Sequence, residues 1–212
     1  MISRRRFLLT STLAATAAPA ILRAAEDDPL AVTVTPDQVV AQNEIVLPPT
    51  TEGSFTIPER YQARVVAVQP GLTPNDIHIV GQSYHLYFIL PGDRAIRYGV
   101  AIGQEGLGWR GSATIGRKVE WPSWRPTDEM IERNPGQYAR YADGMPGGPG
   151  NPLGARALYF YQGDLDTAIR VHGTLEPASI GSSASNGCFR MYNSHVIDLY
   201  NRVPLGVAAF AY

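Results

Sequence analysis

The chain has 212 residues, of which 44% are hydrophobic and 17% are charged. This balance is typical of a globular protein and argues against a disordered chain or a membrane-spanning body. The formal net charge is −1, and the few basic runs stop after the first residues, which argues against a nucleic-acid partner. The length suits one substantial domain with additional segments.

The first 25 residues have the features of an export signal. A twin arginine within Arg4-Arg5-Arg6 precedes a short Ala-rich apolar run (residues 13–22), and Ala18-Pro19-Ala20 offers a small-x-small cleavage site. The twin arginine resembles the signal of the bacterial Tat route; the alternative is a basic amphipathic start of a cytosolic protein. Removal of residues 1–25 would leave 14 basic and 19 acidic side chains, a net charge of −5. We therefore expect an exported, periplasmic protein without a transmembrane anchor in the mature chain.

Residues 26–60 are rich in Pro, Thr and acidic residues and are expected to form an extended leader with a short strand at residues 44–47. A single folded domain is expected over residues 61–212, with its core at about 76–211. Strand-like runs separated by Gly, Pro and Asp turn signals predict antiparallel hairpins and a mainly β fold. The expected strands are residues 76–80, 84–90, 95–102, 158–161, 168–172 and 207–209.

Helical stretches are few. Pro126 and an acidic first turn predict a helix from residue 127 toward residue 141, and a second helix is expected over residues 194–202 with Ser194 or Asn193 as its N-cap. Residues 142–154 contain so much Gly and Pro that we expect a long loop there.

Two motifs fail in their context. Residues 106–111 match G-x-G-x-x-G, but a dinucleotide site needs a helix to begin at that turn, and residues 112–116 are a poor helix start. The four histidines have no H-E-x-x-H spacing, and no second cysteine exists to complete a zinc site. We expect neither a cofactor nor a metal.

The single cysteine, Cys188, is unusual for an exported protein, because cysteines in an oxidising compartment normally pair. A leftover thiol indicates intermolecular pairing, a reactive role, or a buried inert residue. Gly187 permits a turn that could raise the thiol and aim backbone N–H groups at an oxyanion. Arg190 and a nearby imidazolium would favour the thiolate.

His172 lies at the end of a predicted strand in which alternation sends Ile169 and Val171 to one face and Arg170 and His172 to the other. This position suits a general base. His195, in the helix after the cysteine, is the competing partner for the thiol.

These two segments resemble the YkuD-type (ErfK/YbiS/YcfS/YnhG) L,D-transpeptidase family. The family pattern is His-Gly-Thr followed by Ser-x-Gly-Cys-x-Arg, and the resemblance covers roughly residues 60–212. Asn186 stands where many relatives carry His, and Ala113-Thr114-Ile115-Gly116 replaces the common Thr-Pro-x-Gly. The matching motifs are His172-Gly173-Thr174 and Ser185-Asn186-Gly187-Cys188-Phe189-Arg190.

The resemblance implies a β-sandwich or barrel-like catalytic domain with a few short helices. It implies Cys188 as nucleophile, His172 as general base and acid, and the Gly173 carbonyl as the group that orients the imidazole. Amides near Gly187 and Cys188 would form the oxyanion hole. Substrate binding or site support would fall to Arg190, Ser185, Asn186 and Thr174.

The implied donor is a peptidoglycan tetrapeptide stem, and the implied inhibitors are carbapenems. The acceptor stays open: a second stem gives a 3–3 crosslink, a lysine of an outer-membrane lipoprotein gives a protein anchor, and water makes the enzyme an L,D-carboxypeptidase. A sortase-like transpeptidase also places His before Cys, but with a much longer separation. A non-catalytic wall-binding module is the remaining alternative.

Overall fold

The computed structural model describes Leu30, residues 45–104 and residues 108–212. The expected signal, residues 1–25, lies outside the described residues, as does most of the expected leader. Within residues 45–60 the chain forms a small hairpin, β1 (Thr51–Glu52) with β2 (Phe55–Thr56), and enters the 3-10 helix η3 (Glu59–Tyr61). The strand expected at residues 44–47 is absent over Ile45 to Leu47, although both of these side chains pack against the core.

The domain is built on one nine-stranded sheet, which confirms the mainly β fold. Neighbouring strands are antiparallel except β13 with β4 and β10 with β12. The order across the sheet is β12-β10-β9-β8-β13-β4-β5-β6-β3. The strands are β3 (Arg64–Ala67), β4 (Ile77–Val80), β5 (His85–Leu90), β6 (Arg94–Gly99), β8 (Gly111–Glu120), β9 (Arg156–Gln162), β10 (Leu165–His172), β12 (Phe189–Arg190) and β13 (Ala208–Ala211).

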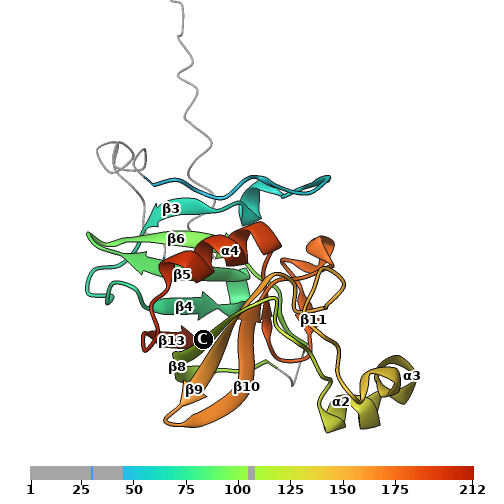
Figure 1. The fold of residues 1–212 in the computed structure, drawn as a ribbon. Coiled ribbons are helices and arrows are strands. Elements are labelled where there is room, and N and C mark those ends of the chain that lie inside the picture. Colours follow the sequence, from blue (N-terminus) through green and yellow to red (C-terminus); the bar gives the residue numbers. More distant parts are fainter. Residues whose placement is uncertain (1–29, 31–44, 105–107) are drawn as a thin grey trace, which may run out of the picture.

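The sheet twists strongly, so that β3 to β6 run nearly across the direction of β9 and β10 (Figure 1). Helix α4 (Asn193–Arg202) lies over one face and buries His195, Val196 and Leu199 there. One core cluster joins side chains from both halves of the sheet with this helix. A second, two-stranded sheet pairs β7 (Ile102–Gly103) with β11 (Ser183–Ser185).

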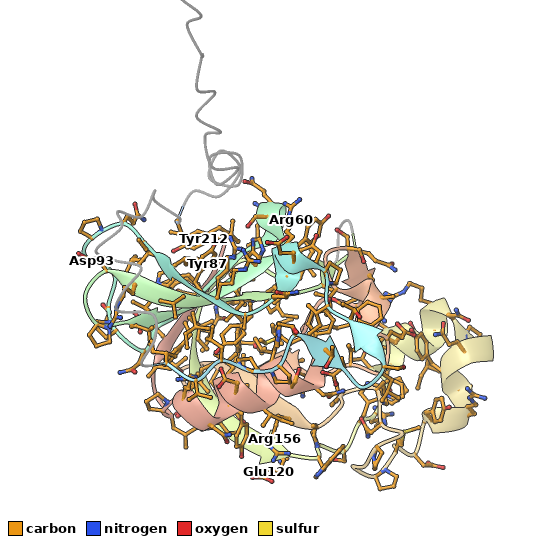
Figure 2. All side chains as sticks on the ribbon, turned by 90° about the horizontal axis from the view of Figure 1, so that it is seen from above. Arg60, Tyr87, Asp93, Glu120, Arg156 and Tyr212 are labelled. Atoms are coloured by element: carbon orange, nitrogen blue, oxygen red, sulfur yellow. The ribbon has the colours of Figure 1, made fainter. Side chains whose placement is uncertain are left out.

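Two short 3-10 helices lie in the connections between strands: η4 (Gly81–Ser83) and η6 (Pro177–Ser179). Figure 2 shows Arg156 and Glu120 side by side at one edge of the molecule, far from Tyr87 and Tyr212. Arg156 on β9 and Glu120 on β8 are register partners, and their side chains form an ion pair of 3.1 Å.

The helix predicted from residue 127 to residue 141 is broken into three pieces. Thr127 caps the first by accepting from the Met130 amide, and Asn134 adopts a non-helical conformation before Pro135, because a residue that precedes proline is disfavoured in the α region. The pieces are α2 (Asp128–Arg133), α3 (Pro135–Tyr138) and η5 (Ala139–Tyr141). They stand apart from the sheet at one corner (Figure 1), and we call residues 123–145 the cap.

The prediction for the start of α4 was wrong. Tyr192 is the N-cap residue and gives no side-chain hydrogen bond, while Asn193 is already helical. The Glu52 carboxylate instead accepts from the Ser194 amide at 3.0 Å and from its hydroxyl at 2.8 Å. A carboxylate at a helix N-terminus satisfies unpaired N–H groups, so the segment before the domain stabilises this helix.

The described part of the glycine-rich motif, residues 108–111, leads into a strand. Gly111 is the first residue of β8, so among the described residues of the motif the chain continues into a strand and not into a helix. Among the described residues, no helix has the length and apolar character needed to cross a membrane.

Candidate active site

A cavity of about 440 Å³ opens between the ends of β10 and β12 and the cap. One wall holds Cys188 and His172 together with Arg170 and Arg190, and the opposite wall comes from the cap. Parallel pairing of β10 with β12 sets His172 opposite Arg190, so the two predicted motifs meet although 14 residues lie between Gly173 and Cys188 in the chain.

His172 is held in one tautomer. Its side chain is only 5% exposed, and Nδ1 lies 2.6 Å from the Gly173 carbonyl oxygen. A carbonyl can only accept, so Nδ1 carries the proton and Nε2 is the basic nitrogen. This is the contact that the family resemblance implies for Gly173.

Gly173 itself is fixed by Asn193. A Cβ added at Gly173 would lie 2.1 Å from Asn193 Oδ1, so a larger residue would displace the Asn193 side chain. Asn193 Oδ1 accepts from the Ala155 amide at 2.9 Å, and its Nδ2 donates to the Thr174 carbonyl at 2.7 Å. Thr174 is buried and its hydroxyl accepts from the Glu176 amide at 3.0 Å. This network holds the backbone that orients His172.

The His172 imidazole is neutral at pH 7, because its pKa is lowered to about 4. Burial is the main cause; the Gly173 hydrogen bond opposes it, and the charges of Arg190 and Arg170 lower the pKa further. The imidazolium that the sequence analysis invoked to favour the thiolate is therefore not the resting form of this residue.

Cys188 follows a tight turn that Ser185 closes. The Ser185 hydroxyl donates to the Cys188 carbonyl and accepts from the Gly187 amide at 3.2 Å. Gly187 has a φ of +123°, a conformation that other residues rarely adopt. The Gly187 amide is thus engaged by Ser185, so an oxyanion that used this amide would compete with the hydroxyl.

The Cys188 thiol is half-buried and lies 3.6 Å from the Ala168 carbonyl oxygen, to which it donates. Burial raises the pKa of the thiol, and the positive charges of Arg170 and then Arg190 oppose this shift. Because the His172 imidazole in the same pocket is neutral, a thiol that acted as nucleophile would have to lose its proton as it attacked.

Asn186 and Arg190 face different partners. Asn186 Oδ1 accepts from Arg133 at 2.8 Å and its Nδ2 donates to the Tyr138 hydroxyl at 3.2 Å, so it joins the turn before Cys188 to α2 and α3 of the cap. Arg190 Nη1 forms an ion pair of 2.8 Å with Glu176. Its backbone N–H and C=O both pair with Ala101.

Sequence reasoning missed Asn193 and Arg170 as site residues. Arg170 shares the face of His172 in the strand alternation, so that signal was available. The contact of Asn193 with Gly173 depends on the tertiary approach of α4 to β10, which no local pattern encodes.

His195 is not placed to act on the thiol. It is fully buried in α4 between the Tyr98 and Tyr192 rings, whose centroids lie 5.7 and 5.1 Å from its own. The other two histidines make structural contacts: His78 Nδ1 lies 2.8 Å from the Tyr212 hydroxyl, and His85 Nε2 lies 3.1 Å from the Arg60 carbonyl.

Fold and site together define a β-domain with one cysteine and one histidine in a shared pocket. A family model of the YkuD L,D-transpeptidase catalytic domain matches residues 74–209. The chain therefore belongs to this family.

Curated relatives agree with this assignment. A putative L,D-transpeptidase of Fuscovulum blasticum is 41% identical over 99 residues, covering 46% of this chain and 47% of the relative. The probable L,D-transpeptidase ErfK/SrfK of Escherichia coli is 28% identical over 167 residues, covering 74% of this chain and 48% of that protein. The chain thus spans about half the length of the curated relatives it matches.

Among solved structures, a chain described as a probable carnitine operon oxidoreductase of Brucella melitensis is 52% identical, with a TM-score of 0.51, and covers 71% of this chain and 93% of its own. The Ldtfm–avibactam carbamoyl enzyme has a TM-score of 0.50 at 14% identity, covering 69% of this chain and 55% of that one. The second similarity concerns the fold alone.

Proposed function

We propose that the protein is an L,D-transpeptidase that acts on peptidoglycan stem peptides through a thioester on Cys188. The observation that carries the proposal is the neutral His172 imidazole, held by the Gly173 carbonyl, in one pocket with the chain's single cysteine. A nucleophile, a base and a group that orients the base are the three parts that covalent acyl transfer needs.

In the first half-reaction His172 Nε2 takes the Cys188 proton as the sulfur attacks the carbonyl of the third stem residue. The carbonyl carbon gains a bond to sulfur, and its oxygen becomes an oxyanion that the Cys188 amide stabilises, joined by the Gly187 amide once that amide leaves the Ser185 hydroxyl. Collapse breaks the peptide bond, and the imidazolium returns the proton to the departing amine of D-alanine. A Cys188 thioester remains.

In the second half-reaction an acceptor attacks the thioester. His172 takes a proton from the acceptor, the carbon–sulfur bond breaks, and the thiolate regains a proton. A stem amine would produce a 3–3 crosslink, a lipoprotein lysine a protein anchor, and water a tripeptide. We propose the transpeptidase, with a stem amine as acceptor.

The pocket suits an anionic peptide. Its walls carry four arginines and one carboxylate, Glu176, and stem peptides carry carboxylates; the arginines are Arg125, Arg140, Arg170 and Arg190. The apolar part comes from Leu175, which is 49% exposed, and from cap residues such as Met130 and Met145. Arg190 is engaged by Glu176, which favours site support as its role.

The remaining residues are proposed to act through position. Ser185 shapes the nucleophile turn, Thr174 fixes the backbone after His172, and Asn186 ties the turn to the cap. We further propose export by the Tat route to the periplasm, where peptidoglycan is found, and acylation of Cys188 by carbapenems. The net charge of −5 after loss of residues 1–25 is compatible with that route.

The test is incubation of the purified protein with tetrapeptide muropeptides, followed by mass spectrometry of the products. Cys188→Ser, which keeps the size of the side chain, and His172→Gln are the matched controls. Loss of D-alanine with a crosslinked dimer, absent in both variants, supports the transpeptidase. Tripeptide alone would assign the carboxypeptidase, and binding without turnover that survives Cys188→Ser would assign a wall-binding module.

A further inference from the structure

Arg170 and Cys188 lie where the parallel strands β10 and β12 begin to pair, and both line the same cavity. The register of β10 with β12 pairs Val171 with Phe189 and His172 with Arg190. Cys188 immediately precedes β12 and Arg170 precedes Val171 on β10, so the two residues come just before the paired positions. Because residues two apart on a strand share a face, Arg170 and His172 point to the side from which Cys188 and Arg190 also project, and all four line the cavity.

The Arg170 guanidinium is held in place before any substrate binds. Nη1 donates to the Ala168 carbonyl at 2.6 Å, and Nη2 lies 3.8 Å from the Asp166 carboxylate. Its Cζ lies 4.6 Å from the centroid of the Tyr159 ring, the register partner of Arg170 on β9. Three contacts to one guanidinium reduce the rotamer freedom that it would otherwise lose during the reaction.

Ala168 brings the thiol and the guanidinium to one oxygen. It has a φ of +61°, which is costly for a residue with a Cβ, and it lies within a register shift between Asp166 and Arg170. The Asp166 carboxylate supports this conformation by accepting from the Ala168 amide at 2.8 Å. The strained carbonyl accepts from Cys188 Sγ and from Arg170 Nη1 together.

This shared acceptor distinguishes the two states of the sulfur. A thiol can donate to the Ala168 carbonyl, but a thiolate has no proton to donate and would face the negative end of that dipole. The Arg170 guanidinium already donates a hydrogen bond to the same Ala168 carbonyl oxygen. A guanidinium remains protonated throughout, so it can stabilise the anion without taking part in proton transfer.

We propose that Arg170 is the counter-ion of the Cys188 thiolate: the Ala168 carbonyl holds the protonated thiol at rest, and the guanidinium receives the sulfur as its proton leaves for His172 Nε2. This inference rests on the proposed role of Cys188 as nucleophile. It adds to the cysteine–histidine–glycine arrangement a charged group that contacts the reacting atom.

The other charges around the sulfur do not replace Arg170. Arg190, on β12, is paired with Glu176, and burial dominates the raised pKa of the thiol, with Arg170 the largest opposing charge. From the cap, Arg125 is paired with Asp128. The charged and titratable groups that face the sulfur or its pocket are Asp166, Arg170 and His172 of β10, Glu176, Arg190 of β12, and Arg125, Arg140, Tyr138 and Tyr141 of the cap.

The test is the pH dependence of Cys188 alkylation by iodoacetamide in the full chain, which has no other cysteine. Arg170→Gln is expected to raise the midpoint of the alkylation profile by about one pH unit or more, which is the size of pKa shift that a neighbouring opposite charge produces. Arg170→Lys keeps a charge without the planar fork and is expected to restore part of the shift.

Arg117→Gln is the matched control. Arg117 is the register partner of Tyr159 on β8, and its Cζ lies 4.9 Å from the centroid of the Tyr159 ring. This variant therefore removes one positive charge that contacts the same ring as Arg170 does, but from the strand on the other side of β9. Its midpoint is expected to equal that of the wild type. If Arg170→Gln does not fold, as thermal denaturation would show, Arg170→Met supplies the neutral side chain.

An unchanged midpoint in the folded neutral variant, or an equal shift in Arg117→Gln, would overturn the proposal. So would a wild-type thiol that resists alkylation at every pH. Alkylation needs no peptidoglycan, so a shifted midpoint without turnover of muropeptides would contradict the proposed function and leave the role of Arg170 intact.

Discussion

His195 should make the protein less stable in acid, by an amount that its burial sets. It is fully buried, and its pKa is lowered from 6.5 to about 4 mainly by that burial, against the opposing charges of Glu52 and Asp198. Between these two pH values the unfolded chain binds a proton that the folded chain does not. The free energy of unfolding therefore rises with pH through this window and falls as the pH drops.

The size of the effect follows from the two pKa values. Each unit of difference corresponds to about 1.4 kcal/mol, so the complete loss below pH 4 is about 3 kcal/mol. Between pH 7 and pH 5 the linkage relation gives a loss of about 2 kcal/mol. His195→Phe removes the titrating group and keeps an aromatic ring between Tyr98 and Tyr192.

Urea unfolding of both proteins at pH 7 and pH 5 measures this difference. Other titrating groups, His172 among them, contribute equally to the two proteins, so the change in pH dependence isolates His195. The wild type should lose about 2 kcal/mol more than His195→Phe between these pH values. An equal loss in both proteins would refute the inference that His195 is buried in the neutral form.

Three further predictions concern the site and its supports. Gly173→Ala should abolish turnover, because the added Cβ would lie 2.1 Å from Asn193 Oδ1, while circular dichroism shows the sheet retained; wild-type activity would contradict this. Asn186→Ala should raise KM several-fold with little change in kcat, since it releases Arg133 and Tyr138 of the cap, and steady-state kinetics would refute the link if KM stayed unchanged. Glu52→Ala should lower the free energy of unfolding by about 1 kcal/mol through loss of the α4 cap, measured in urea, whereas no loss would show that the cap is dispensable.

Much of the fold followed from local sequence patterns. Alternating apolar residues and Gly or Asp turns predicted β4, β5, β6 and the β9–β10 hairpin close to their observed bounds. The strands β3, β8 and β12 were not among the predicted strands. The two residues of β12 are too few for an alternation to show. The helix after residue 127 was predicted too long because the effect of Asn134 and Pro135 was not weighed.

The motif residues were predicted from their types and order, but their surroundings depend on tertiary contacts. Glu52 lies 142 residues before Ser194, so its capping of α4 has no local signal. The left-handed conformation of Ala168 was equally hidden, since alanine has no preference for it. The parallel pairing of β10 with β12 brings Arg170 near the thiol, and the sequence of neither strand alone predicts that register.

The most direct test of the central claim is the mass of the protein after a brief, acid-quenched incubation with a tetrapeptide stem. The account predicts a fraction whose mass has increased by a tripeptide acyl group, mapped by peptide sequencing to Cys188 and labile to hydroxylamine, as a thioester is. Arg170→Gln should accumulate it more slowly, and Cys188→Ser should show no thioester. A wild-type protein that releases D-alanine while its mass never changes, or that carries the adduct elsewhere, would contradict the account.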